Sequence, residues 1–139
     1  MTSINTCDID ENVKTSLKEF RFRKSQKNAA LILKVDRPKQ MICLDEIIED
    51  VQIEDLQERI PSHEPRYIVY SYKMHHTDGR ISYPMCFIFY TPQGIQMELQ
   101  VLYASMKLVL QKQAELTRCY EVRELEELTE EWLKAKLTR

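Results

Sequence analysis

Glycine is scarce in this sequence, since Gly79 and Gly94 are the only two among 139 residues. The Walker loop and the dinucleotide-binding fingerprint each need several glycines within a few positions, so both are excluded. Long apolar runs are lacking too. The longest, such as Ala29–Leu33 and Met85–Tyr90, are too short to span a bilayer, and the charged N-terminus offers no signal-peptide core. We therefore expect a cytoplasmic protein with no membrane partner.

Closely spaced cysteines are also missing. The four cysteines are dispersed, and none forms a Cys-x-x-Cys pair: Cys7, Cys43, Cys86 and Cys119. Zinc sites usually draw on such close pairs, so we expect no metal. Two disulfides remain arithmetically possible, but the apolar neighbours of the cysteines favour buried thiols in a reducing compartment.

A strong charge of either sign is absent, because 20 basic and 22 acidic residues leave a net charge of −2. The molecule as a whole therefore has no field that would attract nucleic acid. The composition, 43% hydrophobic and 30% charged, is typical of a globular protein. The length predicts one domain over residues 1–139, which we expect to act as a monomer without a cofactor.

Periodicity and turn residues predict an α+β fold in which a central mixed β-sheet is sandwiched between α-helices. The predicted strands are Ala29–Val35, Gln40–Leu44, Tyr67–Tyr72, Ile81–Thr91 and Cys119–Val122. The predicted helices are about Asp10–Lys24, Ile53–Arg59, about Ile95–Leu116 and Leu125–Leu137. Pro84 should interrupt the strand Ile81–Thr91 with a bulge or an unpaired position. In the last helix, Leu128, Trp132 and Ala135 are expected to face inward.

The long helix carries two apolar rows at helical spacing. One row is Leu99, Leu102, Met106 and Val109, and the other is Met97, Val101, Ala104 and Leu108. Together they are wider than one core-facing stripe requires. Two interpretations stay open: a helix covered by neighbouring elements, or one core face combined with one partner face.

Catalytic chemistry has no clear signature. His75 and His76 are adjacent, so on a strand they would point to opposite faces and could not easily bind one metal. The acidic residues occur as helix-surface runs rather than as convergent, desolvated groups. We therefore expect a protein that is not an enzyme.

Several longer segments resemble one known family. They are Phe20–Lys24, Asn28–Asp36, Pro65–Tyr72, Asp78–Pro84, Cys86–Phe89, Ala114–Thr117 and Leu128–Leu133. These segments cover nearly the whole chain and are similar to the glia maturation factors, a family of the actin-depolymerising factor/cofilin homology superfamily. The resemblance implies the actin-depolymerising factor homology fold, a mixed sheet between helices, in agreement with the element order above.

The resemblance also implies a partner. Relatives that bind actin carry basic residues just before the motif Tyr103–Lys107, where this chain has Glu98 and Gln100, and an acidic residue where it has Leu108. Losing those charges should weaken actin binding that depends on charge pairing. The resemblance implies instead that the chain binds the actin-related protein 2/3 complex, here called the branching complex. It would promote disassembly of filament branches and inhibit branch nucleation, with filament actin at the junction as a second contact.

Two binding surfaces are suggested by the same resemblance. The first surface would engage an actin-related subunit and comprises Thr2, Ser3, Arg21, Arg23, Lys24, Met106, Lys107 and Lys112. The second surface would press on neighbouring actin or another subunit and comprises His75, His76, Asp78, Arg80, Glu127, Glu130, Glu131 and Lys134. The residues alone also allow a solvated basic run, a core Met106 and a plain Asp-Gly turn. Cofilin-like severing of filaments and a secreted signalling role stay open as alternative functions.

Overall fold

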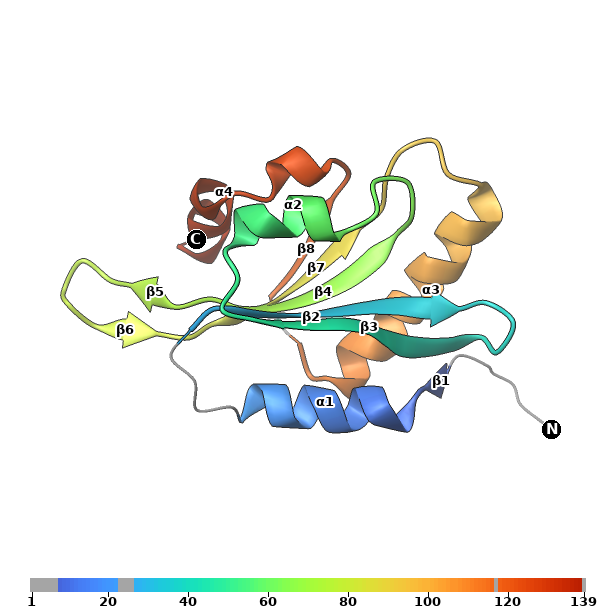
Figure 1. Ribbon diagram of the computed structural model, residues 1–139, viewed down its shortest axis with the longest axis horizontal. Helices are drawn as coiled ribbons and strands as arrows, with labels where there is room; N and C mark the ends of the chain where they lie inside the picture. The colour runs from blue at the N-terminus through green and yellow to red at the C-terminus, as the bar shows by residue number, and fades with distance from the viewer. Residues whose placement is uncertain (1–7, 23–26, 117, 139) are drawn as a thin grey trace.

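The computed structural model of the chain describes residues 8–22, 27–116 and 118–138 (Figure 1). The strands are β1 (Asp8–Ile9), β2 (Ala29–Asp36), β3 (Met41–Glu49), β4 (Arg66–Ser71), β5 (Met74–His75), β6 (Ile81–Ser82), β7 (Met85–Tyr90) and β8 (Cys119–Val122). The α-helices are α1 (Glu11–Arg21), α2 (Leu56–Arg59), α3 (Met97–Gln113) and α4 (Glu130–Leu137). Two short 3₁₀ helices are η1 (Ile53–Asp55) and η2 (Leu125–Glu127).

Six strands form one sheet in the order β1-β3-β2-β4-β7-β8. The pairs β1–β3 and β7–β8 at its two ends are parallel, and the three pairs between them are antiparallel. The predicted mixed sheet is therefore confirmed. The strands β5 and β6 pair only with each other and form a ribbon that projects beyond the sheet, at the end where α4 also lies (Figure 1).

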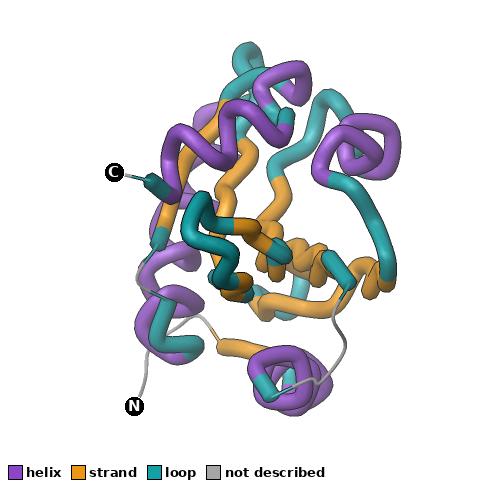
Figure 2. Tube along the Cα trace, turned by 90° about the vertical axis from the view of Figure 1, so that its left-hand side faces the viewer, coloured by secondary structure: helices purple, strands orange, loops and turns teal. Residues whose placement is uncertain are grey.

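Helices cover both faces of this sheet (Figure 2). Successive residues of a strand point to opposite faces, so Leu31 and Leu33 of β2 pack with α1 and α3, whereas Ile32 packs with α2 and α4. On one side of the sheet α1 buries Val13 and Leu17. The expected sandwich of a mixed sheet between helices is therefore the observed fold.

The first helix begins as the sequence predicts. The Asp10 side chain caps α1 by accepting a 3.0 Å hydrogen bond from the backbone N–H of Asn12. The predicted strand Ile81–Thr91 is interrupted where Pro84 falls, and it divides into β6 of the ribbon and β7 of the sheet. Strand β1 was not predicted.

Several predicted elements have different bounds in the structure. The predicted helix Ile53–Arg59 divides into η1 and α2, and the helix predicted over about Ile95–Leu116 is α3, Met97–Gln113. Strand β3 continues to Glu49 instead of ending at Leu44, because Asp45 and Glu46 find cationic partners in Arg66 and Arg59. Acidic side chains with such partners can occupy a strand that their sequence alone would disfavour.

The predicted helix Leu125–Leu137 is wrong as one element. It divides into η2 and α4, and α4 starts after Thr129, whose hydroxyl accepts a 3.1 Å hydrogen bond from the backbone N–H of Trp132. This break shifts the helical face, so Leu133 is buried and Ala135, expected to face inward, is exposed. Leu128 is buried as predicted.

Three of the cysteines lie in the described ranges, and Cys43, Cys86 and Cys119 are free thiols there. No group of His, Cys, Asp and Glu within those ranges could hold a metal ion. Of the helices that the structure describes, none has the length and apolar character needed to cross a membrane.

Candidate functional site

Helix α3 has one buried face and one exposed face. Tyr103, Met106 and Leu110 are buried against the sheet. On the other side Met97, Val101 and Leu108 are 74%, 60% and 64% exposed, and Ala104 lies exposed between them. We call Met97, Val101, Ala104 and Leu108 the α3 apolar row. The interpretation of a helix covered on this side by neighbouring elements is therefore wrong, and the interpretation with one core face and one partner face stays a prediction.

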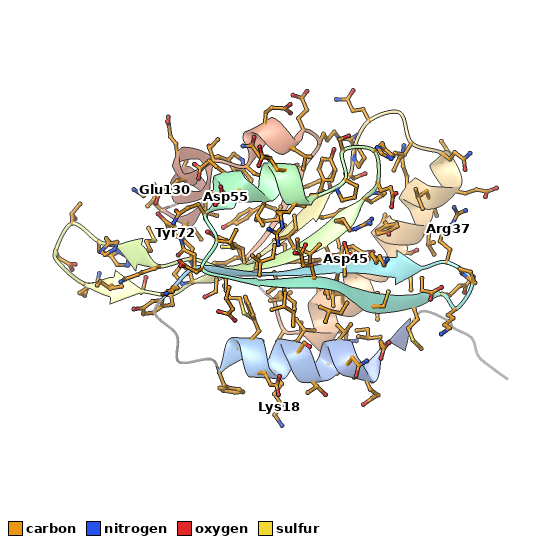
Figure 3. The ribbon with its side chains drawn as sticks, in the orientation of Figure 1. Lys18, Arg37, Asp45, Asp55, Tyr72 and Glu130 are labelled. Carbon is orange, nitrogen blue, oxygen red and sulfur yellow. The ribbon has the colours of Figure 1, made fainter. Side chains whose placement is uncertain are left out.

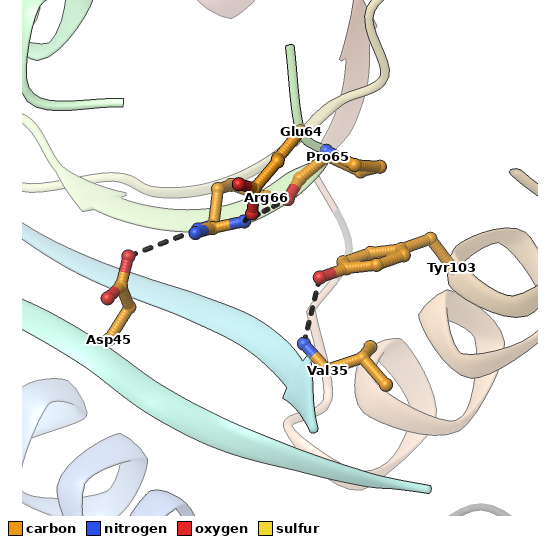
Figure 4. A network of polar contacts seen from close by, with 6 residues as sticks. All are labelled: Val35, Asp45, Glu64, Pro65, Arg66 and Tyr103. Atoms are coloured by element: carbon orange, nitrogen blue, oxygen red, sulfur yellow. Dashed lines mark hydrogen bonds and ion pairs between the residues drawn. The ribbon is translucent and has the colours of Figure 1, made fainter. Parts of the chain in front are cut away.

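The orientation of α3 is fixed by two tyrosines. The Tyr67 hydroxyl donates a 2.6 Å hydrogen bond to the backbone carbonyl of Tyr103, and the two rings lie 5.3 Å apart. The Tyr103 hydroxyl accepts a 3.0 Å hydrogen bond from the backbone N–H of Val35 at the end of β2 (Figure 4). Burial raises the pKa of the Tyr103 phenol, which therefore stays neutral. These bonds join the middle of α3 to β2 and β4, so the helix presents its apolar row from a fixed position.

An arginine clamp stabilises the same end of the sheet. Arg66 is 7% exposed, and its guanidinium lies 3.1 Å from Asp45 and 3.1 Å from Glu64 (Figure 4). It also donates a 2.8 Å hydrogen bond to the carbonyl of Pro65. A buried charge needs such partners, because an unpaired one is very costly. Arg66 therefore contributes to the frame beneath α3 rather than to an exposed surface.

The predicted first surface is only partly described. Thr2, Ser3, Arg23 and Lys24 lie outside the described residues. Lys112 is exposed, four residues after Leu108, and so extends the line of the α3 apolar row.

Met106 is a correction to the predicted first surface. Its exposed fraction is 0%, and it packs in the core between α3 and the sheet. Helical spacing placed it in the inward row, three and four residues from Tyr103 and Leu110. Met106 is therefore a core residue and cannot contact a partner from this position.

The other two residues of the first surface have contacts within the molecule. The Arg21 guanidinium donates a hydrogen bond to the carbonyl of Ala114 and lies 3.5 Å from the Glu115 carboxylate. It thus joins the end of α1 to the end of α3. The Lys107 ammonium lies 5.6 Å from the centre of the Phe89 ring, at cation–π distance. Both residues are placed by the fold, and their truncation should cost some stability.

The ribbon carries part of the predicted second surface. His75 is exposed, whereas His76 is half-buried with its Nε2 2.7 Å from the Ser82 hydroxyl. Asp78 and Arg80 at the tip pair with each other at 2.6 Å. The Arg80 backbone N–H, and then its guanidinium, lower the pKa of the Asp78 carboxyl. The tip is therefore a polar turn held by its own hydrogen bonds.

The ribbon and α4 are connected at the base of the ribbon. The Tyr72 hydroxyl donates a 2.7 Å hydrogen bond to the Glu130 carboxylate, and the two side chains meet in Figure 3. The Glu130 backbone N–H in turn donates a 2.7 Å bond to the carboxylate of Glu54. The structure thus brings the two halves of the predicted second surface to one end of the molecule.

The acidic residues of the second surface are not equivalent. Glu130 is bonded to Tyr72, and Glu127 accepts 3.2 Å hydrogen bonds from the backbone N–H groups of Arg123 and Glu124. These two carboxylates therefore stabilise the start of α4 and the turn η2. Glu131 and Lys134 are exposed and are the better candidates for partner contacts.

The α3 apolar row was missing from the predicted site residues, although its spacing was visible in the sequence. The helical period alone shows two apolar rows but cannot show which row faces solvent. Phe22, which is 69% exposed at the end of α1, was also missed. An aromatic residue between two arginines gives no periodic signal of exposure.

Comparisons with known proteins agree with this fold. Residues 6–138 match the family described as cofilin/tropomyosin-type actin-binding protein. The glia maturation factor of Drosophila melanogaster is 61% identical over 137 residues, covering 99% of each chain. Human glia maturation factor beta is 48% identical over 135 residues, covering 97% of this chain and 95% of the relative.

Solved structures extend the comparison. The solution structure of glia maturation factor from Caenorhabditis elegans has a TM-score of 0.82 and 39% identity, and the match covers 98% of this chain and 99% of that one. The crystal structure of Streptomyces griseoflavus cofilin has a TM-score of 0.80 at 17% identity, over 94% and 96% of the two chains, and so shares the fold. Because these relatives match nearly the whole chain, the chain belongs to the glia maturation factor family of cofilin-type actin-binding proteins.

Proposed function

We propose that this protein binds the actin-related protein 2/3 complex at filament branches, promotes disassembly of the branches and inhibits their nucleation. It would do so as a monomeric, non-enzymatic binding module in the cytoplasm, at the cortex or in lamellipodia. The observation that carries the proposal is the α3 apolar row, exposed on the fold of an actin-regulating family. A row of large apolar side chains on one face of a helix is the form of ligand that enters a hydrophobic groove.

The physical chemistry of the row supports its role as an anchor. Its three large side chains stay mostly in solvent, so their burial by a partner would contribute favourable free energy that folding has left unused. The opposite face of α3 is held by Tyr67 and Val35, so little order is lost when a partner binds. Lys112 beside the row would pair with acidic groups at the rim of the partner's groove.

Two positions disfavour tight binding of actin itself. Glu98 is exposed and acidic at a position where the resemblance to actin-binding relatives implies a base. The Gln100 amide donates a 3.1 Å hydrogen bond to the carbonyl of Ile95 and supplies no cation. A partner that needs cations at these positions would therefore bind weakly.

In the proposed mechanism, the second surface shifts the equilibrium between attached and detached branches towards the detached state. A protein shifts an equilibrium only by the difference in its affinity for the two states. If the α3 apolar row anchors equally well to attached and detached complex, contacts made by His75, Arg80, Glu131 and Lys134 must favour the detached state. The ribbon and α4, which carry these residues, lie away from α3 (Figure 1).

A pull-down with purified branching complex tests the anchor. The double variant Val101→Gln, Leu108→Gln should lose most binding and most branch disassembly, while Ile47→Gln, an exposed apolar residue on β3, serves as the control. Retention of both activities by the double variant would defeat the assignment of the row.

Imaging of single branches at saturating protein tests the second surface. The triple variant Asp78→Ala, Arg80→Ala, Glu131→Ala should bind the complex normally but remove branches more slowly. A normal rate of branch loss would mean that the second surface is idle. Cofilin-like severing, the alternative function that the resemblance leaves open, predicts co-sedimentation with bare filaments instead.

A further inference from the structure

A groove of about 350 Å³ lies between the end of α1 and the end of α3, beside the start of β7. Its apolar lining comes from Leu17, Phe22, Met85 and Ala114. Phe22 is 69% exposed and follows directly after α1, so its ring gives the groove an open aromatic wall. The volume lies at the lower end of the range for ligand sites, about 300–1,000 Å³, and suits one large side chain.

The rim of this groove is basic. Lys14, Lys18 and Arg21 line it from α1, against a single carboxylate from Glu115. Lys14 is also bonded to Glu11 at 3.1 Å, and Arg21 lies 3.5 Å from Glu115. Lys18 extends from the outer side of α1 into solvent (Figure 3). The rim therefore keeps a positive charge although the whole chain has a net charge of −2.

We propose that this groove binds an acidic segment of a partner protein that carries one large apolar side chain. The apolar side chain would enter between Phe22 and Met85, and the flanking carboxylates would pair with Lys18 and Arg21. Apolar contact and charge complementarity together select this kind of segment. A neutral segment would leave the cations without partners, and a plain anion would leave the apolar lining exposed to solvent.

Geometry separates this groove from the α3 apolar row. The row ends at Leu108, whereas the groove includes Gln113 and Ala114 at the end of α3, so the row and the groove share no residue. Peptide binding in the groove therefore does not depend on the proposed binding of the branching complex, and the two can fail separately.

Nuclear magnetic resonance titration of the isotope-labelled full chain provides the test. The probe is a synthetic peptide with one Trp flanked on both sides by Asp and Glu. One control peptide has Ser in place of the Trp, and a second has Lys in place of the acids. We expect saturable shifts at Leu17, Met85 and Ala114 with the first peptide and none with the two controls.

Variants locate the binding. Lys18→Glu should raise the Kd for the acidic peptide at least about fivefold, because one attractive charge pair becomes repulsive. Lys134→Glu makes the same charge change on α4, on the far side of the sheet, and should have no effect. Leu108→Gln should also leave peptide binding intact, whereas it should weaken binding of the branching complex.

Four results would overturn the proposal. The first is equal binding of the Ser peptide, which would reduce the site to non-specific charge attraction. The second is shifts at the α3 apolar row in place of the groove. The third is groove signals that change on dilution without peptide, which would make the groove a contact between copies. The fourth is binding of anionic lipid vesicles that the peptide cannot displace.

Discussion

Truncation of Leu108 to Ala isolates the contribution of the α3 apolar row to binding. Leu108 is 64% exposed, so its loss removes few contacts from the folded molecule. Alanine also has the higher helix propensity. We therefore expect the free energy of unfolding to change by less than about 0.5 kcal/mol, as for other exposed substitutions.

The expected effect on binding follows from the exposed area. Full burial of a Leu side chain contributes about 1.5–3 kcal/mol. Because 64% of Leu108 remains in solvent, a partner could recover up to roughly two-thirds of that, or about 1–2 kcal/mol. This corresponds to an increase of about 5- to 30-fold in the Kd for the branching complex.

Competition binding, measured by fluorescence anisotropy with labelled wild-type protein, gives the Kd directly. Ile47→Ala is the matched control, because Ile47 is an exposed aliphatic residue that lies on β3 rather than on α3. The reasoning is refuted if Leu108→Ala binds like wild type, or if the loss of binding accompanies an equal loss of stability.

Three further predictions concern the fold. Gln40 has a φ of +49°, so Gln40→Gly should relieve about 1–2 kcal/mol of strain against about 0.4–1 kcal/mol of added freedom in the unfolded chain. Urea denaturation should show a net gain in stability, whereas Gln113→Gly within α3 should lose about 1 kcal/mol. Burial raises the pKa of Cys86 from 9.0 to about 12, so the protonated thiol favours folding. Its contribution is complete below pH 9.0 and is lost towards pH 12, at up to about 1.4 kcal/mol per pH unit, and Cys86→Ala should show a shallower decline in the same denaturation series. Glu130→Ala should lower the free energy of unfolding, measured by thermal unfolding, by about 1–2 kcal/mol, because the Tyr72 hydroxyl loses its acceptor. If Glu130→Ala is as stable as the control Glu131→Ala, which changes an exposed residue, the assigned contact is contradicted.

Local signals in the sequence predict most of the elements. The N-cap Asp10 and the spacing of Val13 and Leu17 place α1, and Pro84 marks the break between β6 and β7. These features depend on neighbours within a few residues, which the sequence shows directly. The start of α4 was predictable too, because Thr129 is a good N-cap, but the apolar Leu125 and Leu128 suggested an earlier beginning.

Long-range contacts account for what the sequence did not show. The second half of β3 depends on Asp45 and its ion pair with Arg66, 21 residues further along the chain. Arg21 lies in a basic run that looks solvated in the sequence, yet its guanidinium donates a hydrogen bond to the carbonyl of Ala114. Similarly, Glu130 looks like any surface acid until the fold brings Tyr72 beside it. No pattern of neighbours could distinguish these charges from free ones.

The two faces of α3 have different roles, and this affects how the outer face can change during evolution. Tyr103, Met106 and Leu110 support the core, while Val101 and Leu108 contribute little to it. Substitutions on the outer face are therefore nearly neutral for folding and are free to alter partner choice. A helix of this kind lets one scaffold acquire new partners without first acquiring surplus stability.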